Sequence, residues 1–195
     1  MLRCQHHHYW NWFVFRKMKQ LKTTIDEVKL FEPSLFKDKR GYFFESYHQE
    51  KLKELDLHTQ FVQDNISHSK KDTLRGLHFQ AEPAPQAKLV QVIQGEIIDI
   101  AVDIRKNSPT FKKYVKATLS DTNHHLLYIP EGFAHGFFVK SKTATIHYKC
   151  SSFYNPKYEK SINYLDPSLK INWELGNTSP ILSTKDLNAP LLKTP

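Results

Sequence analysis

The sequence predicts an all-β domain whose short strands close into a sandwich or barrel. From about Thr23 onward, runs of β-branched and aromatic residues recur and turn residues separate them, which is typical of strands. These runs do not alternate with long helical segments, as the crossovers of a parallel sheet require. The chain has 195 residues, of which 39% are hydrophobic. It is therefore long enough for one domain with a sizeable core.

The expected strands follow one another closely along the chain. In order, they are Ile25–Phe31, Tyr42–Ser46, Phe61–His68, Leu74–Phe79, Lys88–Ile93, Glu96–Ile104, Tyr114–Leu119, His124–Ile129, Gly136–Val139 and Thr143–Cys150. The pair Gln94-Gly95 between two of these runs predicts a β-hairpin, because glycine adopts the positive φ of tight turns. One helix is expected at Gln49–Leu55, with short helical turns near Pro156 and Pro167.

The first residues of the chain differ from the rest. They combine the histidine run His6–His8 with several aromatic residues and show no strand or helix periodicity. We expect an N-terminal extension over residues 1–22, poorly ordered, followed by a single domain over residues 23–195. An added segment or an upstream translation start explains residues 1–17 better than a metal-binding or partner-binding tail does.

Charge and composition argue against several classes of function. The net charge of +8 would suit a nucleic-acid partner, but five of these charges lie in residues 1–22, which contain no acid. The remaining residues carry +3 with both signs interspersed, so we expect no nucleic-acid partner. Cys4 and Cys150 are too few for a disulfide framework. No apolar run approaches the ~20 residues of a membrane span, so we expect no membrane partner and a cytoplasmic location.

Strand alternation indicates which polar side chains share an interior. Both faces of the strand that contains Asp99 are partly apolar, so Asp99 is expected to be at least partly buried, either as a satisfied strand residue or as the orienter of a histidine. Tyr148 shares a face with small and apolar residues and points toward the interior. Arg75 and His78 fall on opposite faces of one strand. They share a pocket only if the strand bulges or twists, and Gly76 is where we expect it to do so.

A first motif narrows the fold class. Residues Pro130–His135 read Pro-Glu-Gly-Phe-Ala-His, which resembles the second motif of the cupin superfamily and implies a cupin-type jelly-roll β-barrel with a few short helices. Metal-binding cupins carry His-x-His and then Glu on an earlier strand, whereas this chain has His78 followed by Gln80. A stable transition-metal site needs three or four N, O or S ligands, so no metal is expected. Proton transfer is the alternative use for interior histidines.

Five separated segments carry a more specific resemblance. They are Asp38–Glu45, Phe61–Asn65, Leu74–Gln80, Ile129–Gly136 and Ser183–Asp186, in this order. Together they resemble the dTDP-4-dehydrorhamnose 3,5-epimerase family, and the resemblance runs from about Thr24 to Leu192. It implies an isomerase on the route to activated L-rhamnose that works without a cofactor. Such an enzyme inverts C3 and C5 of dTDP-4-dehydro-6-deoxy-D-glucose and produces dTDP-4-dehydro-L-rhamnose.

The resemblance also implies which residues are catalytic. His78 is the base that removes a proton beside the C4 ketone, and Asp186 orients its ring and stabilises the imidazolium. Tyr148 returns a proton on the opposite face, since a phenol with a pKa of ~10 stays protonated at neutral pH. Lys88 is placed to stabilise the enolate oxygen, although without the resemblance it would be interpreted as a surface lysine.

The remaining site residues bind the dTDP-linked 4-keto-6-deoxy sugar by the same resemblance. Arg40, Arg75 and Lys185 contact phosphate or sugar, and the guanidinium fork suits phosphate because it binds two oxygens at once. Phe43 and Tyr154 stack on the base. Further substrate contacts are Glu45, Gln63, Asp64, Asn65, Lys88, His135 and Glu159, with Asp99 as the orienter of His135. In the family the segment Arg40–Glu45 reaches from a neighbouring subunit, which implies a homodimer.

Other functions stay open on the sequence alone. A nucleotide-sugar epimerase that inverts only C3 or only C5, or a ketoisomerase, uses the same kinds of residues and differs in pocket shape. A metal-dependent cupin would contain stoichiometric iron or zinc inside the barrel. A non-enzymatic binder would keep its function when His78 is replaced.

Overall fold

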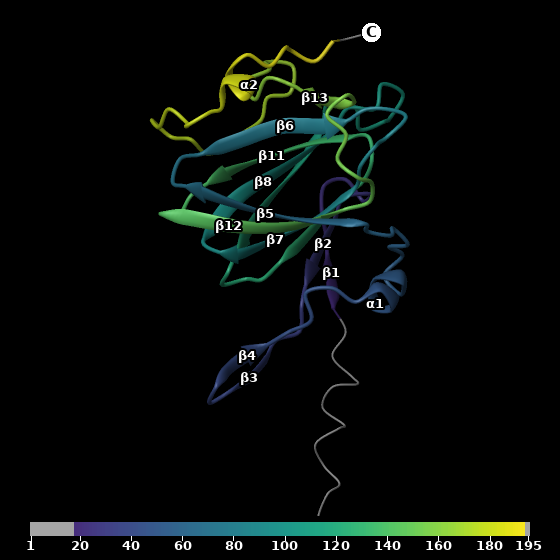
Figure 1. Cartoon of the computed structure of the whole chain (residues 1–195), viewed down its shortest axis with the longest axis vertical. Coiled ribbons are helices and arrows are strands. Elements are labelled where there is room, and N and C mark those ends of the chain that lie inside the picture. The colour runs from purple at the N-terminus through teal and green to yellow at the C-terminus, as the bar shows by residue number, and fades with distance from the viewer. Residues whose placement is uncertain (1–17, 194–195) are drawn as a thin grey trace, which may run out of the picture.

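The computed structural model describes residues 18–193 and contains two antiparallel sheets packed face to face (Figure 1). The histidine run His6–His8 and Cys4, with most of the expected N-terminal extension, lie outside the described residues. Residues 18–22, which were expected to belong to that extension, enter the fold. Met18 is buried, and the short strand β1 that follows it pairs with β2.

The first sheet has six strands in the order β1-β2-β10-β7-β12-β5. Their bounds are Lys19–Leu21 for β1, Lys29–Glu32 for β2, Leu126–Ile129 for β10, Lys88–Gln94 for β7, Thr143–Cys150 for β12 and Gln63–Lys70 for β5. The second sheet has five strands in the order β13-β6-β11-β8-β9. Their bounds are Glu159–Ser161 for β13, Leu74–Gln80 for β6, Phe133–Val139 for β11, Glu96–Asp103 for β8 and Tyr114–Ser120 for β9. This all-antiparallel pair of sheets agrees with the predicted jelly roll.

Three smaller elements lie outside the sheets. β3 (Phe36–Asp38) and β4 (Gly41–Phe43) form a separate hairpin that projects away from the barrel (Figure 1). The helix α1 spans Gln49–Lys53, two residues shorter at its end than expected, and α2 spans Thr184–Leu187. Near Pro156 and Pro167 the backbone makes single hydrogen-bonded turns. No helix in the described part of the chain is long and apolar enough to cross a membrane.

Apolar side chains fill three layers. The cluster between the sheets combines residues of both, among them Val90 and Ile146 of the first sheet with Ala101 and Leu119 of the second. The segment after β13 covers the outer face of the five-stranded sheet, where Trp173 packs against the sheet. The helix α1 and the residues around it cover part of the outer face of the six-stranded sheet. The site described below lies where the two sheets face each other.

The expected hairpin at Gln94-Gly95 is wrong, although the glycine does turn the chain. Gly95 has a φ of +87°, but β7 and β8 on either side of it belong to different sheets and do not pair. A Cβ on Gly95 would lie 2.1 Å from the backbone oxygen of Thr143. The backbone N–H of Gly95 donates to Asp121 at 2.7 Å. Gly95 is therefore a corner at which the chain leaves one sheet for the other. A glycine with positive φ suits such a corner and a hairpin turn equally well, so the local sequence does not distinguish them.

The expected irregularity at Gly76 is confirmed. In the pairing of β6 with β11, His78 lies opposite His135 and Arg75 lies opposite Phe137, so β6 has one residue more than its partner between these points. Gly76 has a φ of +126°, and its Cα approaches that of Gly136 so closely that a Cβ would lie 2.5 Å from it. This bulge shifts the alternation of β6 by one residue, which turns Arg75 and His78 to the same side.

Candidate active site

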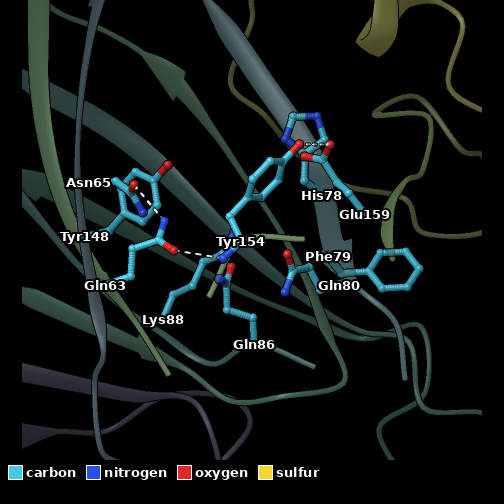
Figure 2. Close-up of a pocket in the computed structure, with 10 residues that line it drawn as sticks. All are labelled: Gln63, Asn65, His78, Phe79, Gln80, Gln86, Lys88, Tyr148, Tyr154 and Glu159. Carbon is cyan, nitrogen blue, oxygen red and sulfur yellow. Dashed lines mark hydrogen bonds between the residues drawn. The ribbon is translucent and has the colours of Figure 1, made fainter. Parts of the chain in front are cut away.

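Two adjoining cavities lie between the sheets, with volumes of about 230 Å³ and about 440 Å³. Three predicted catalytic residues, His78, Lys88 and Tyr148, line both of them. The first cavity is further lined by Gln63, Asn65, Phe79, Gln80, Gln86, Tyr154 and Glu159 (Figure 2). The second is further lined by Ile66, Ser67, His68, Arg75, His135 and Phe137. The five-stranded sheet supplies His78, and the six-stranded sheet supplies Lys88 and Tyr148.

His78 and Asp186, which are 108 residues apart in the sequence, form a short hydrogen bond. The distance between His78 Nε2 and Asp186 Oδ1 is 2.5 Å. The second carboxylate oxygen accepts a hydrogen bond from the hydroxyl of Ser183 at 2.9 Å, and Ser183 also caps α2 by accepting from the backbone N–H of Asp186. The cap thus holds the carboxylate in place. An imidazole that donates Nε2–H to Asp186 keeps its lone pair on Nδ1.

The environments of the two partners differ. The side chain of Asp186 is 2% exposed, whereas that of His78 is 26% exposed and borders both cavities. Burial raises the pKa of the Asp186 carboxyl, but the hydrogen bonds and charge of His78, with smaller contributions from Ser183 and Lys185, outweigh it and lower the pKa below its ordinary value. Asp186 therefore stays a carboxylate at neutral pH and favours a positive charge on His78.

A second histidine–aspartate pair lies beside the first. His135 on β11 donates from Nε2 to both carboxylate oxygens of Asp99 on β8, at 2.9 and 3.0 Å. Asp99 is fully buried, and the His135 side chain is 9% exposed. His135 lies opposite His78 in the strand register and lines the second cavity. The expectation that Asp99 is buried and orients a histidine is confirmed.

Tyr148 and Lys88 form the wall opposite His78. Figure 2 shows Tyr148 and His78 on opposite sides of the cavity. The ammonium nitrogen of Lys88 lies 5.8 Å from the centre of the Tyr148 ring. Burial raises the pKa of the Tyr148 phenol and lowers that of the Lys88 ammonium. The phenol thus remains protonated at neutral pH. The lysine is poorly solvated, so an anion in the cavity would interact with it strongly.

Arg75 reaches the second cavity because of the bulge at Gly76. Its Nε donates to the hydroxyl of Ser69 on β5 at 3.1 Å, so this arginine connects the two sheets. Without the extra residue on β6, strand alternation would direct Arg75 away from His78.

Tyr154, Glu159 and Lys185 meet at the mouth of the first cavity. The Tyr154 hydroxyl donates to Glu159 Oε2 at 3.0 Å, and the ammonium of Lys185 lies 2.6 Å from the same oxygen. Burial raises the pKa of Glu159, but the hydrogen bonds from Lys185 and Tyr154 and the charge of nearby His78 lower it overall. The Glu159 carboxylate therefore holds one aromatic and one cationic side chain. Figure 2 shows Tyr154 and Glu159 beside His78.

The side chains of the Gln63–Asn65 segment point to opposite faces of the sheet. Gln63 and Asn65 line the first cavity, whereas Asp64 lies on the outer face of the sheet. There its two carboxylate oxygens each accept from Lys149 at 3.0 Å, and His147 lies 3.5 Å away. Neighbouring residues of a strand face opposite ways, so Asp64 does not line either cavity of this subunit, and its contact with substrate stays a prediction.

Three predicted binding residues are not brought to these cavities. Arg40 and Phe43 lie on the projecting hairpin β3–β4, where Arg40 pairs with Asp38 at 2.5 Å and Phe43 is 53% exposed (Figure 1). Glu45 lies near α1 and pairs with Lys51. Within one subunit these residues lie away from His78, and their role as substrate contacts across a subunit interface stays a prediction.

Sequence reasoning missed two glutamines of the site. Gln86 lines the first cavity, and Gln80 was considered only as a missing metal ligand. Both amides are engaged by backbone groups of the pocket loops, with bond lengths of 2.7 to 3.3 Å. Each glutamine lies two residues from a predicted catalytic residue in the sequence, Gln80 from His78 and Gln86 from Lys88, and this proximity could have identified them. Within residues 18–193, no three His, Cys, Asp or Glu side chains gather as a metal site would require.

Known proteins share this architecture. A family model described as dTDP-4-dehydrorhamnose 3,5-epimerase matches residues 22–194. The dTDP-4-dehydrorhamnose 3,5-epimerase of Salmonella typhimurium is 50% identical over 173 residues, which cover 88% of this chain and 94% of that protein. The dTDP-6-deoxy-D-glucose-3,5-epimerase of Legionella pneumophila, solved with dTDP-4-keto-L-rhamnose, superposes with a TM-score of 0.86 at 49% identity, over 90% of this chain and 93% of that one.

A third likeness extends the agreement to another bacterial group. The dTDP-4-dehydrorhamnose 3,5-epimerase of Bacillus anthracis, solved with TDP and PPi bound, superposes with a TM-score of 0.86 at 46% identity, over 90% of this chain and 99% of that one. The fold of these epimerases is the cupin-type barrel that the sequence predicted. Family model, sequence identity and superposed fold agree over nearly all of the chain, which therefore belongs to the dTDP-4-dehydrorhamnose 3,5-epimerase family.

Proposed function

We propose that this isomerase converts dTDP-4-dehydro-6-deoxy-D-glucose into dTDP-4-dehydro-L-rhamnose by inverting C3 and C5. The observation that carries the proposal is the 2.5 Å hydrogen bond between His78 and Asp186 at the wall of a cavity shared with Tyr148 and Lys88. Relatives at close to half identity over almost their whole length are named for this reaction.

His78 acts as the base. The hydrogens on C3 and C5 are both adjacent to the C4 ketone, so removal of either proton produces an enolate. Nδ1 of His78 accepts the proton, and the carboxylate of Asp186 stabilises the imidazolium that results. Deprotonation and reprotonation involve no net oxidation or reduction, so the reaction requires no redox cofactor.

Tyr148 and Lys88 complete the reaction from the opposite wall. Tyr148 donates its phenolic proton to the face of the sugar away from His78, which inverts the carbon. Lys88 stabilises the negative oxygen of the enolate, and its poor solvation strengthens this interaction. Base and acid come from different sheets, so the distance between them is set by the packing of the barrel.

The nucleotide part of the substrate binds at the mouth of the first cavity. Tyr154 offers a half-exposed ring for stacking on thymine, and Lys185 and Arg75 offer positive charges for the diphosphate. The Legionella and Bacillus structures contain dTDP-4-keto-L-rhamnose and TDP, respectively, which supports a nucleotide-sugar ligand for this fold. A cytoplasmic location stays a prediction.

In a homodimer, the projecting hairpin β3–β4 would contact the second subunit. Phe43 and Tyr42 are 53% and 56% exposed on β3–β4, and Ile93 at the end of β7 is 54% exposed. Exposed aromatic and aliphatic residues in such number suit a contact with a second copy. In such a dimer Arg40, Phe43 and Glu45 of one subunit would contact the nucleotide of the other.

Complementation between two variants tests this dimer. Arg40→Ala and His78→Ala should each be nearly inactive alone, and mixing them under exchange conditions should restore turnover. In a mixed dimer, the subunit with an intact His78 receives an intact hairpin from its partner. Absence of restored turnover, or a monomer by sedimentation, would contradict the arrangement.

Incorporation of deuterium from heavy water tests the reaction itself. With dTDP-4-dehydro-6-deoxy-D-glucose as substrate, we expect label at both C3 and C5 of the product. Label at only one carbon identifies a single epimerase, and a shifted ketone identifies a ketoisomerase; either result contradicts the proposal. Tyr148→Phe should still exchange a proton through His78 but form much less inverted product.

A further inference from the structure

Side chains, and not a neighbouring strand, hydrogen-bond the backbone of the segment that carries Tyr154. Residues 152–155 follow β12 without regular secondary structure, so their backbone groups lack the ladder partners that a strand would supply. Glutamine side chains supply them instead. Three glutamines that line the first cavity, Gln63, Gln80 and Gln86, bind the backbone of residues 152–155; we call this set the glutamine clamp (Figure 2).

Gln80 holds two points of the segment with one amide. Its Nε2 donates to the carbonyl of Phe153 at 3.3 Å, and its Oε1 accepts from the backbone N–H of Asn155 at 2.7 Å. A neighbouring parallel strand would bind the residues on either side of Tyr154 in the same way. Nε2 also donates to the carbonyl of Ala84 at 2.9 Å, which ties in the loop that leads to Lys88. Gln80 is 6% exposed, so its bonds face little competition from water.

Gln63 and Gln86 hold the remaining points. Gln63 Oε1 accepts from the backbone N–H of Tyr154 at 2.8 Å, while its Nε2 donates to Asn65 at 3.0 Å. Gln86 Nε2 donates to the carbonyl of Ser152 at 2.7 Å. The clamp thus joins β5 of one sheet and β6 of the other to the segment between them.

We propose that Gln80 is a positioning residue that, together with Gln63 and Gln86, fixes the Tyr154 ring where a nucleobase can stack on it. This inference rests on the proposed function, because it takes the ligand to be a thymine nucleotide. A ring that is 53% exposed on an irregular segment gains affinity when its backbone is held before the ligand arrives. The bond between His78 and Asp186 does not involve the clamp, so the clamp acts on binding and leaves the proton-transfer groups in place.

Replacement of Gln80 separates an effect on nucleotide binding from an effect on proton transfer. Gln80→Leu keeps the approximate volume and removes all three hydrogen bonds. We expect dTDP to bind about tenfold or more weakly and KM to rise in parallel, since each lost bond is worth up to about tenfold in affinity. The kcat should change by less than about threefold. Gln94→Leu, at an exposed position of β7, is the matched control and should leave the Kd for dTDP, KM and kcat unchanged.

Amide hydrogen exchange in the ligand-free protein tests the clamp independently of catalysis. In Gln80→Leu the Asn155 amide should exchange faster, whereas in Gln80→Glu it should stay protected, because the carboxylate still accepts from it. Gln80→Glu should nevertheless weaken dTDP binding, since its charge faces the carbonyls of Ala84 and Phe153. If Gln80→Leu does not fold, Gln80→Glu and Gln86→Leu still test the effect of the clamp on dTDP affinity.

Distinct results separate failure of this inference from failure of the proposed function. Unchanged affinity for dTDP in the Gln80 variants, or a fall in kcat at unchanged KM, overturns the positioning role. A wild-type protein that binds no dTDP and exchanges no deuterium into the sugar overturns the proposed function. In that case, the exchange rates of the Asn155 amide still decide whether Gln80 holds the segment.

Discussion

The two histidine–aspartate pairs of this barrel have the same chemistry but opposite settings. His135 and Asp99 lie on adjacent strands of one sheet, and both are nearly or fully buried. His78 and Asp186 connect a strand to a short helix near the C-terminus, and the histidine remains 26% exposed. His135 Nε2 donates to both carboxylate oxygens of Asp99. In the other pair, one oxygen of Asp186 accepts from His78 and the second accepts from Ser183.

This difference in exposure bears on which of the two histidines can act as the proposed base. A base needs a free nitrogen that a substrate can reach and a partner that stays charged. His78 meets both conditions, because it borders both cavities and hydrogen bonding lowers the pKa of Asp186. The enclosure of His135 makes it a fixed part of the wall, suited to contact the sugar and to hold two strands together.

Replacement of the two histidines should give the largest contrast. We expect His78→Ala to lower kcat by about 10⁴-fold, the upper range for loss of a general base, and His135→Ala to lower it much less. Binding of dTDP should survive in both variants, because the nucleotide contacts lie elsewhere. Steady-state kinetics and calorimetry measure this, with the exposed His58→Ala as the control. Equal losses of kcat would remove the distinction between the pairs.

Asp186→Asn should have the next largest effect. It keeps the size of the side chain but removes the charge that favours the imidazolium of His78. We expect kcat to fall by about 10²-fold, less than for loss of the base itself, with KM nearly unchanged. The measurement is kcat and KM across pH, with Asp26→Asn at an exposed position as the matched control. A change confined to KM would show that Asp186 acts on binding instead.

Asp99→Ala should affect stability more than turnover. It leaves the buried Nε2–H of His135 without its acceptor, which costs about 1–3 kcal/mol of unfolding free energy. Urea unfolding should show a larger loss for Asp99→Ala than for Asp186→Asn. The kcat of Asp99→Ala should remain above that of Asp186→Asn. The reverse order in either measurement would contradict the assignment of roles.

The dependence of stability on pH should show the smallest effect. The pKa of Asp186 is lower in the folded protein than in the unfolded chain, so its contribution to stability is present above the unfolded pKa and is lost as pH falls through the folded pKa. Thermal melting should show a gap between wild type and Asp186→Asn that is constant above pH ~4 and narrows below it. If the difference in melting temperature between the two proteins does not narrow below pH ~4, folding does not lower the pKa of Asp186.

Local sequence patterns predicted individual features of the site, whereas its catalytic and binding residues came from the family resemblance. Strand alternation with a glycine break at Gly76 anticipated that Arg75 and His78 share a pocket, and the burial of Asp99 followed from the apolar residues around it. The same local logic was wrong at Gly95, because a positive φ turns the chain equally well into a hairpin or across to another sheet. Strand alternation directs Asp64 outward, whereas its assignment as a substrate contact came from the family resemblance.

By itself, the sequence determined the all-β class, most strand positions and the chemical types present in the site. The class and the strand positions follow from side-chain periodicity and turn residues, which act over a few positions. The residues of the site followed from the family resemblance. Tertiary structure alone decided which of these groups meet. The partner of His78 lies 108 residues away, and Tyr148, the proposed acid, belongs to the other sheet. Such contacts depend on how two sheets pack over a shared core, and no local pattern records that packing.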